Sequence, residues 1–181
     1  AAKYVDELSP AAQIIGAVNT IVNDDGRLTG YITDGEGFVH NLKDHGVDIK
    51  GKKITVAGGG GAATALQVQC ALDGAREITI FNIKDAFFER TLQTAEKIRK
   101  AVPGIVVNVY DIADTAKMTE EITSSDIFAN ATIVGMKPMD DQSVVKDLSA
   151  FRPGLVVCDA VYNPAETKLL REAKEAGCTC I

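Results

Sequence analysis

The residues best suited to chemistry in this sequence follow an apolar run that ends in four consecutive glycines. Gly58, Gly60 and Ala63 fit the spacing G-x-G-x-x-G/A, in which the glycines permit a tight turn and close approach of backbone to a pyrophosphate. A helix that begins there directs unpaired N–H groups toward phosphate. The pattern indicates a dinucleotide site, with a glycine-rich turn that binds nothing as the alternative. A Walker phosphate loop is excluded because no Gly-Lys-Ser/Thr follows.

The end of the next expected strand is where an adenosine ribose would be recognised. An acidic residue there favours NAD, whereas an arginine favours NADP. Asn82 ends the strand, and Ile83, Lys84 and Asp85 follow it. Asp85 could accept from ribose hydroxyls or cap the next helix, and Lys84 is a poor substitute for a planar arginine group. We therefore expect NAD as the cofactor, with NADP as the alternative.

The elements that must position these residues alternate regularly from residue 53 onward. Apolar runs at 53–57, 77–82, 105–111, 126–132 and 154–160, and a sixth from 178, are separated by expected helices at 61–74, 85–102, 115–125 and 166–177. The second helix would turn inward Phe87, Phe88, Leu92, Ala95 and Ile98. This alternation predicts an α/β fold, a doubly wound Rossmann-like parallel sheet with helices on both faces. Ligands bind such sheets at the carboxyl ends of the strands.

The first fifty residues follow another pattern. Two strand-like runs flank NDDG at 23–26, which is a hairpin signal, and a helix is expected over 34–46. This segment has the character of the tail of another domain plus a connecting helix.

Composition limits the classes of partner. The 181 residues carry a net charge of -6, which argues against nucleic acid or an anionic membrane as a partner. No apolar run is long enough to span a bilayer, and the start of the chain lacks the layout of a signal peptide. The four cysteines contain no C-x-x-C, so reduced thiols in a cytoplasmic protein are expected rather than a metal site. The missing initiator Met suggests a cut piece.

Taken together, the motifs resemble the shikimate/quinate dehydrogenase family, and within it the quinate/shikimate dehydrogenase branch. The resemblance runs in order through GAVNTIV (16–22), GYITDGEGF (30–38), the glycine turn, FNIKD (81–85), NATIVGMKP (130–138) and VYNPAETKLL (161–170). It implies an NAD(P)-dependent oxidoreductase of the chorismate pathway to the aromatic amino acids. Such an enzyme interconverts shikimate with 3-dehydroshikimate, or quinate with 3-dehydroquinate.

The resemblance also implies roles for single residues. Asn19 and Asp34 would hold the substrate, with Tyr162 touching it, and Asp34 would share acid–base catalysis with a lysine. Contacts to the cofactor are implied for Gly59, Gly60, Gly61, Ala62, Asn82, Lys84, Asp85, Thr132, Lys137, Ala160, Val161, Tyr162 and Asn163. From the residues alone, Asp34 could instead cap a helix, Asn19 could serve a turn, and Tyr162 could be a surface aromatic.

The sequence departs from the family pattern at two positions. Ile32 and Ile83 stand where many members have Asn and Arg, which removes a polar group near the substrate and a contact to phosphate or adenine. The family's catalytic lysine and its carboxylate-binding serines match no motif here, and Lys3 lies outside any motif.

We therefore expect a chain truncated at both ends. Residues 1–33 would be the remnant of an N-terminal substrate domain with a connecting hairpin, and residues 34–181 the NAD(P)-binding domain with its linking helix. Alone it would have little activity. A non-catalytic NAD-binding regulatory module is the alternative, and a homodimer is a further expectation. The paired AVNT and TDG motifs argue against a methylene-tetrahydrofolate dehydrogenase.

Overall fold

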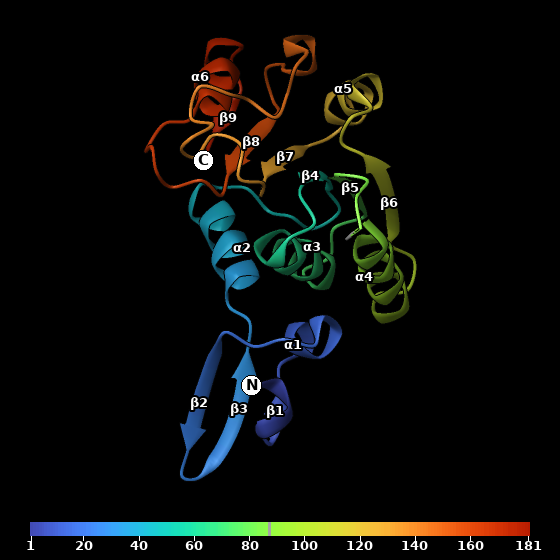
Figure 1. Ribbon diagram of the computed structural model, residues 1–181, viewed down its shortest axis with the longest axis vertical. Helices are drawn as coiled ribbons and strands as arrows, with labels where there is room; N and C mark the ends of the chain where they lie inside the picture. The colour runs from blue at the N-terminus through green and yellow to red at the C-terminus, as the bar shows by residue number, and fades with distance from the viewer. Residues whose placement is uncertain (87) are drawn as a thin grey trace.

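A six-stranded parallel sheet forms the centre of the computed structural model, which describes residues 1–86 and 88–181 (Figure 1). Its strands are β4 (Lys53–Ala57), β5 (Glu77–Asn82), β6 (Val106–Asp111), β7 (Ile127–Asn130), β8 (Val156–Asp159) and β9 (Thr179–Cys180). Their order is β6-β5-β4-β7-β8-β9, so the chain reverses its direction of winding between β4 and β7. This confirms the predicted doubly wound α/β fold.

Helices cover both faces of the sheet, because the strand residues alternate between two buried layers. Ile80 belongs to the cluster under α3 (Gly61–Leu72) and α4 (Phe88–Ala101), whereas its neighbour Phe81 belongs to the opposite cluster. That second layer is closed by α5 (Thr115–Thr123), the 3-10 turn η2 (Leu148–Ala150) and α6 (Lys168–Glu175). Consecutive side chains of a strand point to opposite faces, so a strand buried on both sides is apolar throughout.

Strands β4 and β5 have the predicted bounds, whereas β7 and β8 are shorter than the apolar runs that predicted them. The run 126–132 forms a strand only to Asn130, and the run 154–160 only to Asp159. The residues that follow these two strands form loops at the carboxyl edge of the sheet. On α4, Ala95 and Ile98 are buried as predicted, but Leu92 is exposed. Phe87 lies outside the described residues.

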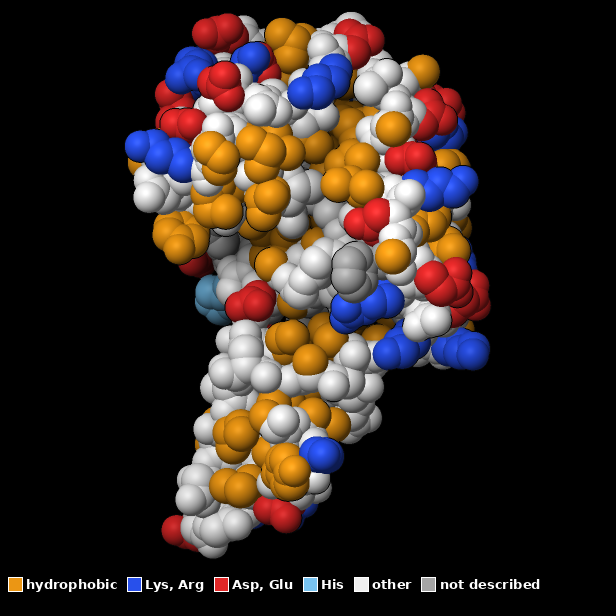
Figure 2. Space-filling model, in the orientation of Figure 1, with side chains coloured by type: hydrophobic (Ala, Val, Ile, Leu, Met, Phe, Trp, Pro, Cys, Tyr) orange, Lys and Arg blue, Asp and Glu red, His pale blue; other side chains and the backbone are white. Residues whose placement is uncertain are grey.

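The predicted hairpin is present. β2 (Thr20–Asp24) pairs antiparallel with β3 (Arg27–Tyr31), and the turn residues Asp25 and Gly26 both have positive φ. Such a two-residue turn matches the twist of the strands that it joins. The short strand β1 (Glu7–Leu8) pairs parallel with β3 on its other side, after the 3-10 turn η1 (Ala2–Tyr4). The hairpin extends away from the parallel sheet, and hydrophobic side chains lie on its visible face (Figures 1 and 2).

A helix that the sequence pattern did not predict, α1 (Pro10–Ile15), connects β1 to the hairpin. Its local signals are complete, since the Ser9 side chain accepts the Ala12 N–H, Pro10 opens the helix and Gly16 ends it at φ 80°. Ala11 and Ala12 are buried in the cluster that also contains α3. The division at residue 33 remains a prediction, and residues before it contribute to the main core.

Helix α2 (Asp34–Asp44) packs against α3 at a point where no side chain fits. A Cβ on Gly35 would lie 2.3 Å from the Ala65 carbonyl oxygen, so the two backbones are almost in contact. Val39 and Leu42 are buried further along the same helix. Residue 34 is thereby held close to the helix that begins at the glycine turn.

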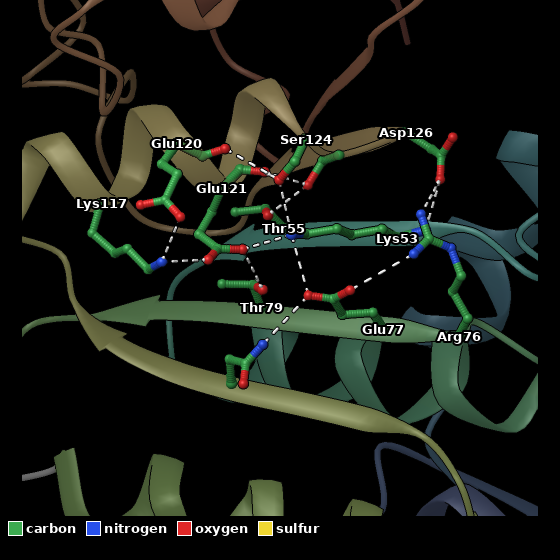
Figure 3. Close-up of polar contacts among 12 residues, drawn as sticks. Lys53, Thr55, Arg76, Glu77, Thr79, Lys117, Glu120, Glu121, Ser124 and Asp126 are labelled. Carbon is green, nitrogen blue, oxygen red and sulfur yellow. Dashed lines mark hydrogen bonds and ion pairs between the residues drawn. The ribbon is translucent and has the colours of Figure 1, made fainter.

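A buried ionic network lies at the amino ends of β4 and β5, opposite the glycine turn (Figure 3). Lys53 Nζ contacts Glu121 at 2.7 Å and Glu77 at 3.1 Å, and the Lys53 and Glu121 side chains are 9% and 7% exposed. Thr79 Oγ1 also donates to Glu121 at 3.1 Å. Burial acts to lower the pKa of Lys53, but its hydrogen bonds to Glu121 and Glu77 outweigh that effect and raise it. The network therefore carries charge inside the fold.

Candidate dinucleotide and substrate site

The glycine turn joins the carboxyl end of β4 to α3. Gly58 has a φ of 121°, and a Cβ there would lie 2.6 Å from the Ala131 carbonyl oxygen, so glycine is required. The buried Gln67 side chain donates to the Gly58 carbonyl at 2.9 Å and fixes the turn from within α3. Gly60 is the N-cap of α3, with open space around its Cα. The two glycines differ as the spacing predicts: Gly58 forms the tight turn, and the outer side of Gly60 is unobstructed.

Gly59 is glycine for a reason that sequence reasoning missed. A Cβ on this residue would lie 2.4 Å from Thr91 Oγ1 and 2.5 Å from Asn82 Nδ2. Asn82 Nδ2 itself donates to Thr91 Oγ1 at 3.0 Å. Asn82, at the end of β5, therefore packs against the turn and also lines the clefts on either side of it.

Two clefts open on either side of the glycine turn. The first, which we call the strand-edge cleft, has a volume of about 460 Å³ and lies at the carboxyl ends of β4, β5, β6 and β7. Its lining is Gly58, Gly59, Gly60, Asn82, Ile83, Ile112, Ala113, Thr115, Ala131, Thr132, Ile133, Val134, Gln142, Ser143, Val144 and Lys146. Most of these side chains are apolar. The cleft suits a flat apolar ring more than a phosphate.

The second, the helix-side cleft, has a volume of about 490 Å³ and lies between the glycine turn, the end of α1 and the outer face of α4. Its lining is Ile15, Gly16, Ala17, Ile32, Gly59, Gly60, Gly61, Thr64, Asn82, Ile83, Asp85, Arg90, Gln93, Thr94 and Lys97. The prediction missed Arg90 and Lys97, although their spacing places both on one face of a helix. They give this cleft two cationic side chains, beside the acidic Asp85.

Asn19 and Asp34 are brought together although 15 residues separate them. Asn19 Nδ2 donates to Asp34 Oδ1 at 3.1 Å, and Asn19 Oδ1 accepts the Thr33 N–H at 3.1 Å. Both residues are exposed. Thr33 occupies the cap position and Asp34 is the first residue of α2, so the alternative of Asp34 as the cap residue is wrong. Its carboxylate still benefits from the positive end of the helix dipole.

Only some of the remaining predicted site residues line one of the two clefts. Thr132 lines the strand-edge cleft and Asp85 the helix-side cleft, and Gly61 and Ala62 form the first turn of α3. The predicted residues that line neither cleft are Asn19, Asp34, Ala62, Lys84, Lys137, Ala160, Val161, Tyr162 and Asn163. Of these, Val161 is buried and Tyr162 is 89% exposed. Ile32, where the family pattern has a polar residue, is buried and borders the helix-side cleft.

These features fit a dinucleotide. The first N–H groups of a helix have no intrahelical acceptor, and here they follow Gly60, where nothing lies within 4 Å of the position that a Cβ would take. The strand-edge cleft and the helix-side cleft, which contains Arg90 and Lys97, meet at that point. Among the described residues, no group of three or more His, Cys, Asp or Glu side chains is arranged to hold a metal ion. In the same part of the chain, no helix has the length and apolar character needed to cross a membrane.

Comparison with known proteins gives consistent matches. The whole chain is 49% identical to a quinate/shikimate dehydrogenase of Escherichia coli and spans 62% of that protein's length. A solved shikimate 5-dehydrogenase of Listeria monocytogenes, in complex with shikimate and NAD, matches 99% of this chain and is matched over 62% of its own, with a TM-score of 0.95 and 50% identity. No family model matches.

Two more distant structures share the fold. A ligand-free 5-ketofructose reductase of Gluconobacter is 30% identical with a TM-score of 0.83, over 99% of this chain and 61% of its own. A quinate dehydrogenase of Corynebacterium glutamicum, in complex with NAD, is 29% identical with the same TM-score, over 98% of this chain and 61% of its own. On these matches and on the ordered motifs, the chain is similar over nearly its whole length to about three fifths of shikimate and quinate dehydrogenases.

Proposed function

We propose that the chain is the NAD(P)-binding part of an oxidoreductase that acts on a ring hydroxyl of shikimate or quinate. The observation that carries the proposal is the Asn19–Asp34 pair, which is held at the start of α2 while α2 rests on α3 through Gly35. Asp34 of this pair and the helix terminus proposed to bind phosphate thus lie on two touching helices, α2 and α3. A purely regulatory module would not need the pair.

In the proposed reaction NAD accepts a hydride from the carbon that bears the hydroxyl. Asp34 accepts a hydrogen bond from the substrate hydroxyl and takes part in moving its proton. Asn19 keeps the Asp34 carboxylate oriented, because its own carbonyl oxygen is fixed by the Thr33 N–H. Gly60 and the first turn of α3 receive the pyrophosphate.

We propose NAD as the preferred cofactor. Ile83 is 60% exposed and borders both clefts, so the position that would meet a 2′-phosphate carries an apolar side chain. Arg90 and Lys97 leave NADP as the alternative, since they add positive charge to the helix-side cleft. Titration calorimetry with NAD and with NADP tests the choice, and tighter binding of NADP would contradict it.

The acid–base partner of Asp34 is expected to be a lysine that no motif of this chain provides. We therefore expect NAD binding but negligible turnover of shikimate or quinate by these 181 residues alone. A steady-state assay with each acid tests this, and turnover like that of a full-length relative would refute it. In a full-length enzyme carrying this sequence, Asp34→Asn should lower kcat at least a hundredfold while NAD affinity changes less than twofold.

Two further parts of the proposal concern assembly and location. A homodimer is proposed and is tested by the sedimentation coefficient over a range of concentrations. A cytoplasmic location is supported by four cysteines that are all free thiols, which is typical of reducing compartments. Fractionation of cells that express the protein tests the location.

A further inference from the structure

A partly buried network of hydrogen bonds through Asp159 joins the carboxyl ends of β7 and β8. Asp159 Oδ1 accepts Asn130 Nδ2 at 2.9 Å and the Val161 N–H at 3.0 Å, while Oδ2 accepts Thr167 Oγ1 at 2.7 Å. Asn130 is 1% exposed and Thr167 is fully buried. One carboxylate therefore connects the ends of two neighbouring strands to the start of α6, where Thr167 is the N-cap.

Asn130 extends this hydrogen-bond network into the loop that follows β7. Its Nδ2 also donates to the Val134 carbonyl at 3.0 Å. Its Oδ1 accepts both the Thr132 N–H, at 3.1 Å, and the Thr132 hydroxyl, at 2.7 Å. Because the Asn130 amide group has one donor end and one acceptor end, the acceptor Asp159 orients Nδ2 toward itself and leaves Oδ1 to accept from Thr132.

The 131–135 loop packs closely against Thr167 and Asp159 of the network. Gly135 has a φ of 104°, and a Cβ there would lie 3.3 Å from Thr167 Cγ2 and 3.9 Å from Asp159 Oδ2. On the other side, the Val161 N–H donates to Asp159 and so ties the start of the next loop to the same side chain. The Asp159 carboxylate therefore positions both the 131–135 loop and the 160–163 loop.

Burial raises the pKa of the Asp159 carboxyl above its usual value, although hydrogen bonds from Val161, Thr167 and Asn130 act in the other direction. Burying a carboxylate costs free energy unless hydrogen bonds offset it, and three donors surround this one. An apolar residue at this position would leave the Asn130, Val161 and Thr167 donors without this acceptor. The carboxylate therefore ties both loops to the ends of the two strands.

We propose that Asp159 is a positioning residue for the second half of the dinucleotide site. Each half of a doubly wound sheet receives one mononucleotide, and β7, β8 and β9 form the half opposite β4, β5 and β6. Asp159 holds the loops 131–135 and 160–163 in the arrangement that receives the nicotinamide end. The inference rests on the proposed function and concerns only one end of the cofactor.

The first test needs no ligand. Amide hydrogen exchange is compared among the wild type, Asp159→Asn, Thr167→Val and Thr167→Ser. Asp159→Asn and Thr167→Val should raise exchange at least tenfold in both 131–135 and 160–163 and leave the glycine turn unchanged. Thr167→Ser keeps the hydroxyl and should match the wild type. Faster exchange in only one of the two loops would overturn the coupling.

The second test separates the two halves of the ligand. ADP-ribose and NAD are titrated against each variant by calorimetry. Asp159→Asn and Thr167→Val should weaken NAD at least tenfold and ADP-ribose less than twofold. Equal weakening of both ligands, or of neither, overturns the inference while leaving the proposed function intact. Failure of the wild type to bind NAD overturns the proposed function and the inference with it.

Glu121→Gln is the matched control, because Glu121 is a buried, hydrogen-bonded carboxylate that lies at the opposite ends of the strands. It should leave the ratio of the NAD and ADP-ribose affinities within twofold of the wild type, measured where the protein is folded. A change of that ratio as large as in Asp159→Asn would mean that general destabilisation causes the effect. If Asp159→Asn fails to fold, the Thr167→Val and Thr167→Ser pair decides the question.

Discussion

Gly35 and Ala65 bring α2 and α3 together through their backbones. A Cβ on Gly35 would lie 2.3 Å from the Ala65 carbonyl oxygen and 2.6 Å from Gln69 Cβ. Asp34 immediately precedes this contact, and α3 begins four residues before Ala65, at Gly61. The position of the Asp34 carboxylate relative to the glycine turn is therefore set by one helix crossing.

Gly35→Ala should lower the free energy of unfolding by about 1–3 kcal/mol, the usual cost of overpacking, since the added methyl must push α2 off α3. Gly37→Ala, two residues on in the same helix, is the control because nothing lies within 4 Å of its Cβ position. That change should stabilise the protein by about 0.5–1 kcal/mol. Urea denaturation measures both, and equal effects of the two substitutions would contradict the close crossing.

Substitutions at two neighbouring glycines of the turn should affect different properties, NAD affinity at Gly60 and stability at Gly59. Gly60→Ala places a methyl in open space and should leave stability within about 0.5 kcal/mol, but it should weaken NAD at least tenfold by keeping the pyrophosphate off the backbone. Gly59→Ala meets Thr91 and Asn82 and should destabilise the fold by about 1–3 kcal/mol. Thermal denaturation and calorimetry measure the two effects. Unchanged NAD affinity in Gly60→Ala would place the pyrophosphate elsewhere.

The apolar side chain of Ile83 should determine the preference between cofactors. Ile83→Arg puts a guanidinium beside both clefts and should raise the affinity for NADP relative to NAD at least tenfold. Lys84→Arg introduces the same group one residue on, at a position that lines neither cleft, and should change the ratio less than twofold. Paired titrations with the two cofactors give the ratio. A larger response to Lys84→Arg would reverse the assignment.

Removal of Lys53 should be costly because it leaves Glu121 buried without its closest cation. Lys53→Met is expected to lower the free energy of unfolding by about 3–5 kcal/mol. Lys52→Met is the control, since Lys52 is 44% exposed and contacts Asp126 only at 3.7 Å; it should cost less than about 1 kcal/mol. Chemical denaturation measures both. A cost below about 1 kcal/mol for Lys53→Met would show that the network is well hydrated.

The same ionic network should make the stability of the protein decrease at acidic pH. Burial acts to raise the pKa of Glu121, but hydrogen bonds from Lys53 and Lys117 and the charge of Lys53 outweigh burial and hold the pKa below its usual 4.5. The stability that Glu121 contributes is therefore present above pH 4.5 and is lost as the pH falls through the lower pKa of the folded state. Denaturation midpoints between about pH 5 and pH 3 should fall more steeply for the wild type than for Glu121→Gln. Parallel curves would contradict this.

The sequence by itself determined the elements and their order. The apolar runs at 53–57 and 77–82 and the amphipathic stretches between them are local patterns, so they predict strands, helices and the doubly wound sheet directly. Gly58 and Gly60 indicated the turn because their spacing in the sequence and the positive φ of Gly58 are local features. The helix α1 was missed although Ser9 and Pro10 signalled it, because six residues give too little periodicity.

The tertiary structure alone decided which distant residues meet. Asn19 and Asp34 are adjacent because the β2–β3 hairpin returns the chain to its starting point. Gly35 and Gly59 are glycines because Ala65 and Asn82 approach them from other elements. Asp159, an ordinary residue in an apolar run, joins Asn130 and Thr167. Such contacts depend on packing between elements, and a single sequence records the elements but not the distances between them.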